Sequence, residues 1–298
     1  MQSMKNILVV LDTGDAARYV LEKAASLAQA NHATLHAVRV VYEGVADLVP
    51  SVIDQSVDLK TFILESAEAE LEELLDPVRR KVDALESATL WNHRHWEGVL
   101  HAAEQSGADL IIKGAEPHGR FGEVIRTPDD WNLLRHATVP VMLVKPQAWV
   151  PEPRILCALD PFDDSHRKLS IALLQESQGL ASVLGGELTV VVAYPLFEPW
   201  VGELGALGNY EELKQNIETE IRSRVDDLAR EAGVRFRDLV AEEGHATQVI
   251  SQVAEDTDAE LLVIGTHARE GVKGVLLGNT SERILHAVAT DVVTVHGN

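Results

Sequence analysis

The chain has 298 residues, more than one hydrophobic core usually organises, so we expect two domains of about 150 residues each. Apolar residues make up 46% and charged residues 24%, as in ordinary globular proteins, and no apolar stretch of about 18 residues would span a bilayer. The net charge of −21 repels the phosphates of nucleic acids and of acidic membranes, which disfavours both as partners.

The first predicted elements are a strand over residues 7–12, an apolar run that ends in Asp12, and a helix over residues 16–30. The residues before this strand lack the apolar region and cleavage site of a secretory signal, so we expect a cytoplasmic protein. An irregular stretch over residues 43–59 is long enough for a lid or a binding loop. A long acidic helix follows over residues 65–84, and we expect Pro77 to kink or interrupt it.

Two histidines, His93 and His95, alternate along the next predicted strand and would point to the same side of the sheet. Zinc requires three or four convergent ligands, and no cysteine accompanies this pair, so we expect no metal site. The single cysteine, Cys157, lies inside an apolar run and is expected to be a packed thiol.

The second half of the chain repeats the first. Residues 155–160 repeat the apolar run and final aspartate of residues 7–12, and residues 259–265 repeat residues 108–114 at a displacement of 151 positions. The closing strands, over residues 139–144 and 290–295, keep that displacement. Three matched blocks in one order predict a duplicated domain. Because a proline-rich segment separates the copies, we place the domains at residues 1–148 and 149–298.

In each half, short β-branched runs alternate with segments of helical period, including residues 165–184 and 211–231 in the second copy. Strands that are apolar throughout, such as residues 188–193, suit a parallel sheet buried on both faces and joined by right-handed helical crossovers. The predicted fold class is therefore α/β, with two tandem doubly wound, mostly parallel open sheets of Rossmann-like type. Residues 195–209 form a second irregular stretch that suits a lid or a binding loop.

The loop from Gly265 to Arg283 carries four glycines, three cations and a helix start rich in capping residues. Glycines permit close approach of the backbone, while Asn279, Thr280 and Ser281 offer side-chain donors and the N–H groups of a new helix. Phosphate is the anion that suits these features best, although an ordinary turn with a helix cap would use the same residue types. No phosphate-loop, dinucleotide-binding or nucleophile-elbow motif is present, which disfavours the common dehydrogenase, phosphate-loop and hydrolase classes.

The same loop resembles a motif of the universal stress protein family, whose ATP-binding members carry Gly, two residues, Gly, nine residues and Gly-Ser/Thr. Here two residues separate Gly265 from Ala268, and nine residues separate Ala268 from Gly278, which is followed by Asn279. The resemblance extends over both halves, with further matching segments at residues 91–94, 127–135 and 244–250, and is greatest to tandem members of the E type.

The resemblance implies a universal stress protein fold and an adenine nucleotide, ATP or AMP, bound with or without Mg²⁺ in the C-terminal domain. Asp160 and the neighbourhood of Ala193 would face adenine and ribose, and the glycine-rich loop, with His267 as a donor, would hold the phosphates. Asp160 could equally cap its own turn. The full predicted set is Ala158, Leu159, Asp160, Ala193, Ile264, Gly265, Thr266, His267, Ala268, Gly278, Asn279, Thr280 and Ser281.

The first copy departs from this pattern, because Thr127-Pro128-Asp129-Asp130 stands where the second copy has its phosphate donors. Carboxylates repel phosphates and proline lacks an N–H, so we expect no phosphate site there. We interpret the first copy as a degenerate domain that pairs with the second, or as a pocket for an uncharged ligand.

The leading hypothesis is a stress-response protein that binds a nucleotide as a regulatory or interaction switch. Slow ATP hydrolysis is one alternative, and a scaffold without nucleotide, suggested by Ala268 and Asn279, is the other. From the resemblance, the closing strands over residues 139–144 and 291–295 would pair and form an intrachain pseudo-dimer, which would cover exposed sheet edges. Homodimerisation of whole chains stays open.

Overall fold

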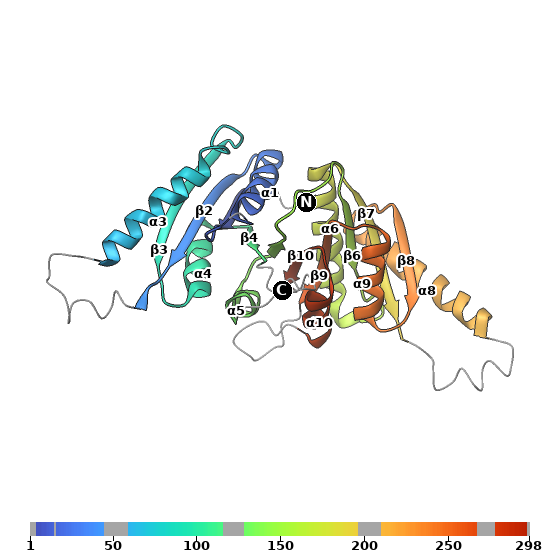
Figure 1. Ribbon diagram of the computed structural model, residues 1–298. Helices are drawn as coiled ribbons and strands as arrows, with labels where there is room; N and C mark the ends of the chain where they lie inside the picture. The colour runs from blue at the N-terminus through green and yellow to red at the C-terminus, as the bar shows by residue number, and fades with distance from the viewer. Residues whose placement is uncertain are drawn as a thin grey trace. The chain divides into compact units, whose positions relative to one another are not determined.

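The structure is a computed structural model that describes residues 4–14, 16–44, 59–115, 128–195, 210–266 and 278–296. Its contacts divide the chain into two compact units, one ending at Trp149 and the other beginning at Val150. We describe the units separately as the N-terminal and the C-terminal domain. Figure 1 shows that each consists of a twisted sheet with helices packed against it.

The N-terminal domain alternates strands and helices in the predicted manner. Its elements are β1 (Asn6–Val10), α1 (Ala16–Asn31), β2 (Thr34–Val41), α3 (Leu59–Leu75), β3 (Ala84–Trp91), α4 (His95–Ser106), β4 (Leu110–Gly114), α5 (Pro128–His136) and β5 (Val141–Val144). The strand order is β3-β2-β1-β4-β5, with parallel pairing from strand to strand. The chain therefore reverses its direction of travel between β1 and β4, where open α/β sheets bind ligands.

The C-terminal domain repeats this topology. Its elements are β6 (Arg154–Ala158), the short 3-10 helix η2 (Asp164–His166), α6 (Arg167–Leu184), β7 (Glu187–Tyr194), α8 (Tyr210–Ala232), β8 (Asp238–Glu243), α9 (Ala246–Asp256), β9 (Leu261–Thr266), α10 (Asn279–Ala287) and β10 (Asp291–His296). The order β8-β7-β6-β9-β10 places its switch point between β6 and β9. The predicted fold class and the duplication are thus confirmed.

The core of each domain follows from its apolar strands. Leu261, Leu262 and Val263 of β9 are completely buried, as are Ile111 and Ile112 of β4. Both faces of the central strands are covered, because right-handed crossovers place one pair of helices on each side. In the C-terminal domain, α6 packs beside α8 and α9 packs beside α10 (Figure 1).

A glycine in the fourth strand of each domain is required by packing. A Cβ added at Gly265 would lie 2.8 Å from Cδ2 of Leu169, and one added at Gly114 would lie 3.0 Å from Cγ2 of Val20. Leu169 belongs to α6 and Val20 to α1, which are equivalent helices. The first helix of each domain therefore crosses its sheet so closely that an added side chain would force Leu169 or Val20 to shift.

Two predictions about local structure are wrong. The acidic helix predicted to reach residue 84 ends at Leu75, and β3 begins at Ala84. Pro77 explains the early end, because proline lacks an N–H and restricts the residue before it. His93 and His95 do not share a strand, since β3 ends at Trp91 and His95 begins α4. The irregular stretches predicted as lids lie largely outside the described residues.

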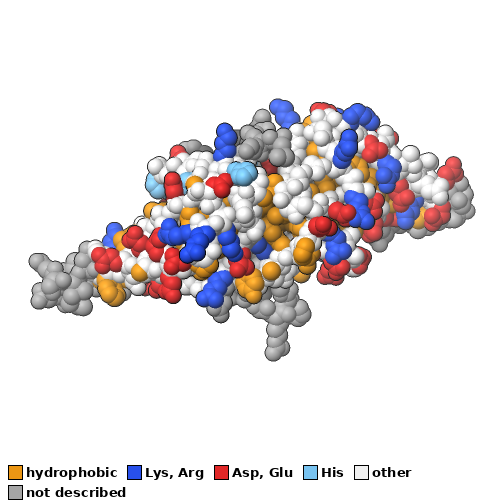
Figure 2. Space-filling view, turned by 90° about the horizontal axis from the view of Figure 1, so that it is seen from above, with side chains coloured by type: hydrophobic (Ala, Val, Ile, Leu, Met, Phe, Trp, Pro, Cys, Tyr) orange, Lys and Arg blue, Asp and Glu red, His pale blue; other side chains and the backbone are white. Residues whose placement is uncertain are grey.

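Acidic and basic side chains are interspersed over the face of the molecule in Figure 2. Many form local pairs along a helix, as Arg224 does with Glu220 at 2.7 Å and Arg230 with Asp227 at 2.6 Å. Within the described residues, no helix is both long and apolar enough to cross a membrane. Cys157 is packed as predicted, and burial raises the pKa of its thiol to about 12, despite a hydrogen bond with Ser177.

Candidate functional site

A cavity of about 260 Å³ lies at the carboxyl ends of β6, β7 and β9 in the C-terminal domain. This position is the switch point of the sheet, where loops diverge and helix N-termini converge. Its walls bring together many of the residues predicted from the sequence, namely Ala158, Leu159, Asp160, Ala193, Ile264, Gly265, Thr280 and Ser281.

The other predicted residues lie outside this lining. Gly278 is the N-cap of α10, and Asn279 is the first residue of that helix and lines an adjoining groove. The side chain of Thr266 is directed to β10, where its hydroxyl donates to the carbonyl of Val295 at 3.3 Å. His267 and Ala268 lie outside the described residues.

The start of α10 is held against the cavity by a side chain of its first turn. Ser281 Oγ donates to the carbonyl of Gly265 at 2.9 Å, which ties the helix to the end of β9. Gly278 has extended dihedral angles and supplies no side-chain cap to α10. Within the part of the chain that the structure describes, no side chain caps α10, and its first turn and the positive end of its dipole favour an anion.

Asp160 caps its own turn, one of the two alternatives considered from the sequence, and also lines the cavity. Its Oδ1 accepts a hydrogen bond from the backbone N–H of Phe162 at 3.1 Å, so the carboxylate caps the turn after β6. The same exposed side chain lines the cavity, where it is able to accept hydrogen bonds from hydroxyl or amine groups.

An aspartate–histidine pair in the wall was not recognised from the sequence. His166 Nδ1 lies 2.6 Å from Oδ2 of Asp163, while Oδ1 of Asp163 accepts from the N–H of Ser165 at 3.0 Å. The hydrogen bonds from Ser165 and the proximity of His166 lower the pKa of Asp163. The run of polar residues from Asp163 to His166, shortly after Asp160, is the signal that could have identified this pair.

Apolar side chains complete the wall, and these too were missed. Leu169 and Leu173 come from α6, and Ala246 and Ile250 come from α9. In the sequence they are indistinguishable from other core positions of amphipathic helices, because only the tertiary packing places them beside the cavity.

The equivalent edge of the N-terminal domain is occupied by charged side chains, which we call the N-terminal charge network: Asp12, His95, Lys113 and Asp130. Lys113 Nζ lies 2.9 Å from Oδ1 of Asp130 and 3.6 Å from Oδ2 of Asp12. His95 Nε2 lies 3.2 Å from Oδ1 of Asp12. Lys113 is only 5% exposed and Asp130 only 1%, so two opposite charges are buried together.

In the C-terminal domain, the positions equivalent to those four residues hold Asp160, Ala246, Ile264 and Ser281, in that order. All four of these line the cavity. Three small or apolar side chains thus leave space where the N-terminal domain places a histidine, a lysine and an aspartate.

The network also changes the acidity of Asp12. Burial alone would raise its pKa, but the hydrogen bond with His95 and the positive charge of Lys113 outweigh burial and lower the pKa to about 2. Within the described part of the chain, no group of three or more histidine, cysteine, aspartate or glutamate side chains is arranged to hold a metal ion.

Comparison with known proteins gives a consistent relationship over the whole chain. Residues 4–145 and residues 153–296 each match the sequence model described as the Universal stress protein family. The chain is 26% identical to Universal stress protein E of Escherichia coli strain K12, and the alignment covers 99% of this chain and 95% of that protein. It is 25% identical to the Universal stress protein E homolog of Haemophilus influenzae, with coverage of 98% and 97%.

Two solved structures show the same relationship in three dimensions. A crystal structure of a protein of unknown function from Pseudomonas aeruginosa PAO1 matches with a TM-score of 0.73 and 27% identity, covering 99% of this chain and 93% of that one. A universal stress protein from Archaeoglobus fulgidus DSM 4304 matches with a TM-score of 0.65 and 17% identity over 99% of both chains, which is a likeness of fold alone.

Proposed function

This chain belongs to the universal stress protein family, with two family domains in tandem, and we propose that its C-terminal domain binds an adenine nucleotide, ATP or AMP, as a regulatory switch. The observation that carries the proposal is the cavity at the switch point of the C-terminal sheet, beside the start of α10. Its position and lining suit a nucleoside with an attached phosphate.

The two ends of the cavity suit the two ends of such a ligand. Leu159 and Ile264 supply apolar surface for a base, and Asp160 accepts hydrogen bonds from ribose hydroxyls or from the adenine amine. Thr280 and Ser281 lie in the first turn of α10, whose free amides and dipole favour a phosphate.

The same argument leads us to propose that the N-terminal domain binds no nucleotide. The N-terminal charge network pairs its charges internally and occupies the positions whose equivalents line the C-terminal cavity. A phosphate placed there would meet the carboxylate of Asp130 instead of the hydroxyl of Ser281.

The proposal is tested by isothermal titration of the whole chain with ATP and Mg²⁺ and with AMP, using wild type and Gly278→Asp. An aspartate N-cap favours a helix, so this variant should stay folded while its carboxylate takes the amides that the phosphate would use. We expect one site per chain in wild type and binding weaker by roughly 100-fold or more in the variant, since a fixed carboxylate at the phosphate position also repels the ligand.

The matched control is Asn216→Asp, which adds the same charge on the exposed surface of α8. It should bind nucleotide like wild type. If wild type gives no heat with either nucleotide, or if Gly278→Asp binds as well as the control, the proposal fails. The scaffold hypothesis would then be favoured.

Slow hydrolysis of a bound ATP is a second candidate function, and the pair of Asp163 and His166 in the cavity wall favours it. A histidine oriented by a carboxylate is able to accept a proton from an attacking water. The test measures phosphate release from ATP. Release by wild type that exceeds background and is lost in His166→Gln would support an activity. Release by wild type that equals release by Gly278→Asp would reject it.

A further inference from the structure

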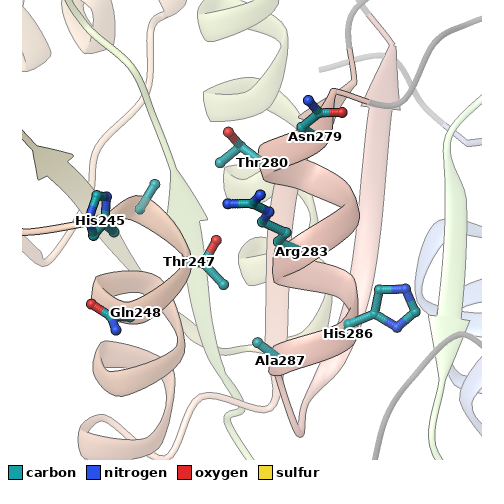
Figure 3. A pocket seen from close by; sticks show the side chains of 9 residues that line it. His245, Thr247, Gln248, Asn279, Thr280, Arg283, His286 and Ala287 are labelled. Atoms are coloured by element: carbon teal, nitrogen blue, oxygen red, sulfur yellow. The ribbon is translucent and has the colours of Figure 1, made fainter.

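A second concavity adjoins the cavity, and we call it the α9–α10 groove. Its volume is about 710 Å³, and it lies between the first turn of α9 and one side of α10, from Asn279 to Ala287 (Figure 3). Ala246 and Thr280 line both the groove and the cavity, so a ligand held in one reaches directly into the other.

The charge of the α9–α10 groove is opposite to that of the chain. Its described lining contains Arg283, His245 and His286 but no aspartate or glutamate, in a protein whose net charge is −21. Figure 3 shows the Arg283 side chain extending from α10 towards Thr247 on α9, whereas His286 points away. Within the described residues, the guanidinium of Arg283 forms no hydrogen bond or ion pair, so its donors face the groove unpaired.

The N-terminal domain closes the equivalent groove between α4 and α5. Trp96 of α4 stacks on His136 of α5, with ring centroids 4.7 Å apart. Arg94, the N-cap of α4, forms a 2.6 Å ion pair with Glu97. In that domain, the two aromatic rings therefore occupy the space between the helices, and Glu97 pairs with the positive charge of Arg94.

Smaller residues keep the C-terminal groove open. Thr247 and Ala287 stand at the positions equivalent to the stacked tryptophan and histidine. His245, at the position of Arg94, is the N-cap of α9 and makes no side-chain cap to its helix. Two helix starts without side-chain caps, an unpaired guanidinium and an imidazole thus face one continuous space.

We propose that the α9–α10 groove holds the outer phosphates of a nucleoside triphosphate, and that Arg283 and His245 make the site prefer triphosphates to monophosphates. This inference rests on the proposed function and names the ligand class within it. A planar guanidinium matches the oxygens of a phosphate in geometry as well as charge. A monophosphate that sits at the start of α10 would not extend to Arg283. The preference for triphosphates over monophosphates therefore depends on the number of phosphates in the nucleotide.

The first experiment measures binding of ATP and AMP to wild type, Arg283→Gln and the control Arg235→Gln, which removes an exposed arginine before β8. We expect Arg283→Gln to weaken ATP about tenfold, in line with the loss of a charge-assisted hydrogen bond, and to change AMP less than twofold. Equal effects on both ligands, or no effect on ATP, would overturn the inference.

The second experiment transfers the N-terminal stack into the C-terminal domain as Thr247→Trp with Ala287→His. Filling the groove should again reduce binding of ATP and spare that of AMP. A double variant that binds ATP as wild type does would contradict the groove as a phosphate site.

The two proposals fail in different ways. Gly278→Asp removes binding of both nucleotides, whereas the groove variants alter only the ratio of ATP to AMP. If wild type binds neither nucleotide, the proposed function is rejected, and titration with inorganic tripolyphosphate tests the groove alone. Binding heat with tripolyphosphate in wild type that is absent in Arg283→Gln would support the groove as a phosphate site. Equal heats in wild type and Arg283→Gln would reject it.

Discussion

The two domains share one topology but treat the carboxyl edge of their sheets in opposite ways. In the C-terminal domain, Ile264 and Ser281 border a cavity, whereas in the N-terminal domain Lys113 and Asp130 stand at the same positions and pair with each other. The backbone that forms the site is thus independent of the side chains that occupy it. A fold of this kind keeps a binding edge or replaces it with internal contacts.

The two domains also differ in which groups pair with the polar and charged atoms at this edge of the sheet. Among the described residues, the start of α10 has no side-chain cap. In the N-terminal domain the carboxylates of Asp12 and Asp130 already have Lys113 as an internal cation. Burying a charge is costly unless it is paired, so the network is stable only while its members remain together. The predictions below test this dependence, starting with the largest expected effect.

Removing the cation of the network should cause the largest loss of stability. Lys113→Met leaves Asp130 buried without its ammonium partner, and breaking a buried pair from one side costs about 3–5 kcal/mol. The measurement is the free energy of unfolding in urea, followed by a probe in the N-terminal domain.

The double variant Lys113→Ile with Asp130→Ser is the matched control, because it installs the residues of the C-terminal domain. It removes both charges and should recover most of the lost stability. If the unfolding free energy of Lys113→Met lies within about 1 kcal/mol of the wild-type value, the ion pair of Lys113 and Asp130 contributes no more than a typical surface pair. That result would contradict the prediction.

The close helix crossings give a smaller effect that again compares the domains. An added methyl group overlaps Leu169 at Gly265 and Val20 at Gly114, and overpacking typically costs about 1–3 kcal/mol. The contact at Gly265 is shorter, and Leu173 also lies within 3.3 Å of the added atom. We therefore expect Gly265→Ala to lower the unfolding free energy more than Gly114→Ala does. Thermal unfolding of both variants would show this order or reverse it.

The acidity of Asp12 predicts the smallest effect, which depends on pH. Its pKa falls from 3.8 to about 2 in the folded state, so its contribution is fully present above pH 3.8 and is lost as the pH falls through about 2. Asp12→Asn should be less stable than wild type near neutral pH. The difference in unfolding free energy should shrink as the pH falls from 3.8 to about 2. A difference that stays constant from neutral pH to pH 2 would exclude this role.

Much of the fold was predictable, because repeated apolar blocks and helical periods are local signals. The parallel sheets, the duplication and the helix predicted over residues 211–231, found as α8, follow from such patterns. The helix that ends at Leu75 was overextended, since its acidic pattern continues past the residue where Pro77 takes effect. His95 was misplaced because a short β–α connection resembles the end of a strand.

The candidate site was predictable only in part. A glycine-rich loop and a helix start rich in capping residue types are visible in the sequence and lead to Gly265, Thr280 and Ser281 in the cavity wall. Lys113 gave no such signal, because one lysine in an apolar run does not reveal the aspartate that α5 brings to it. Pairings of this kind depend on how a helix lies over a strand, which no local pattern specifies.

The buried pair of Lys113 and Asp130 bears on how the two halves diverged. An apolar residue at position 113 alone would leave the buried carboxylate of Asp130 without its ammonium partner, whereas Lys113 without Asp130 would still have Asp12 at 3.6 Å. The two single replacements therefore differ in cost, and replacing both residues together avoids the larger cost. The pair therefore constrains the order in which this edge of the sheet can change, because Lys113 is replaced at low cost only after Asp130 has been replaced.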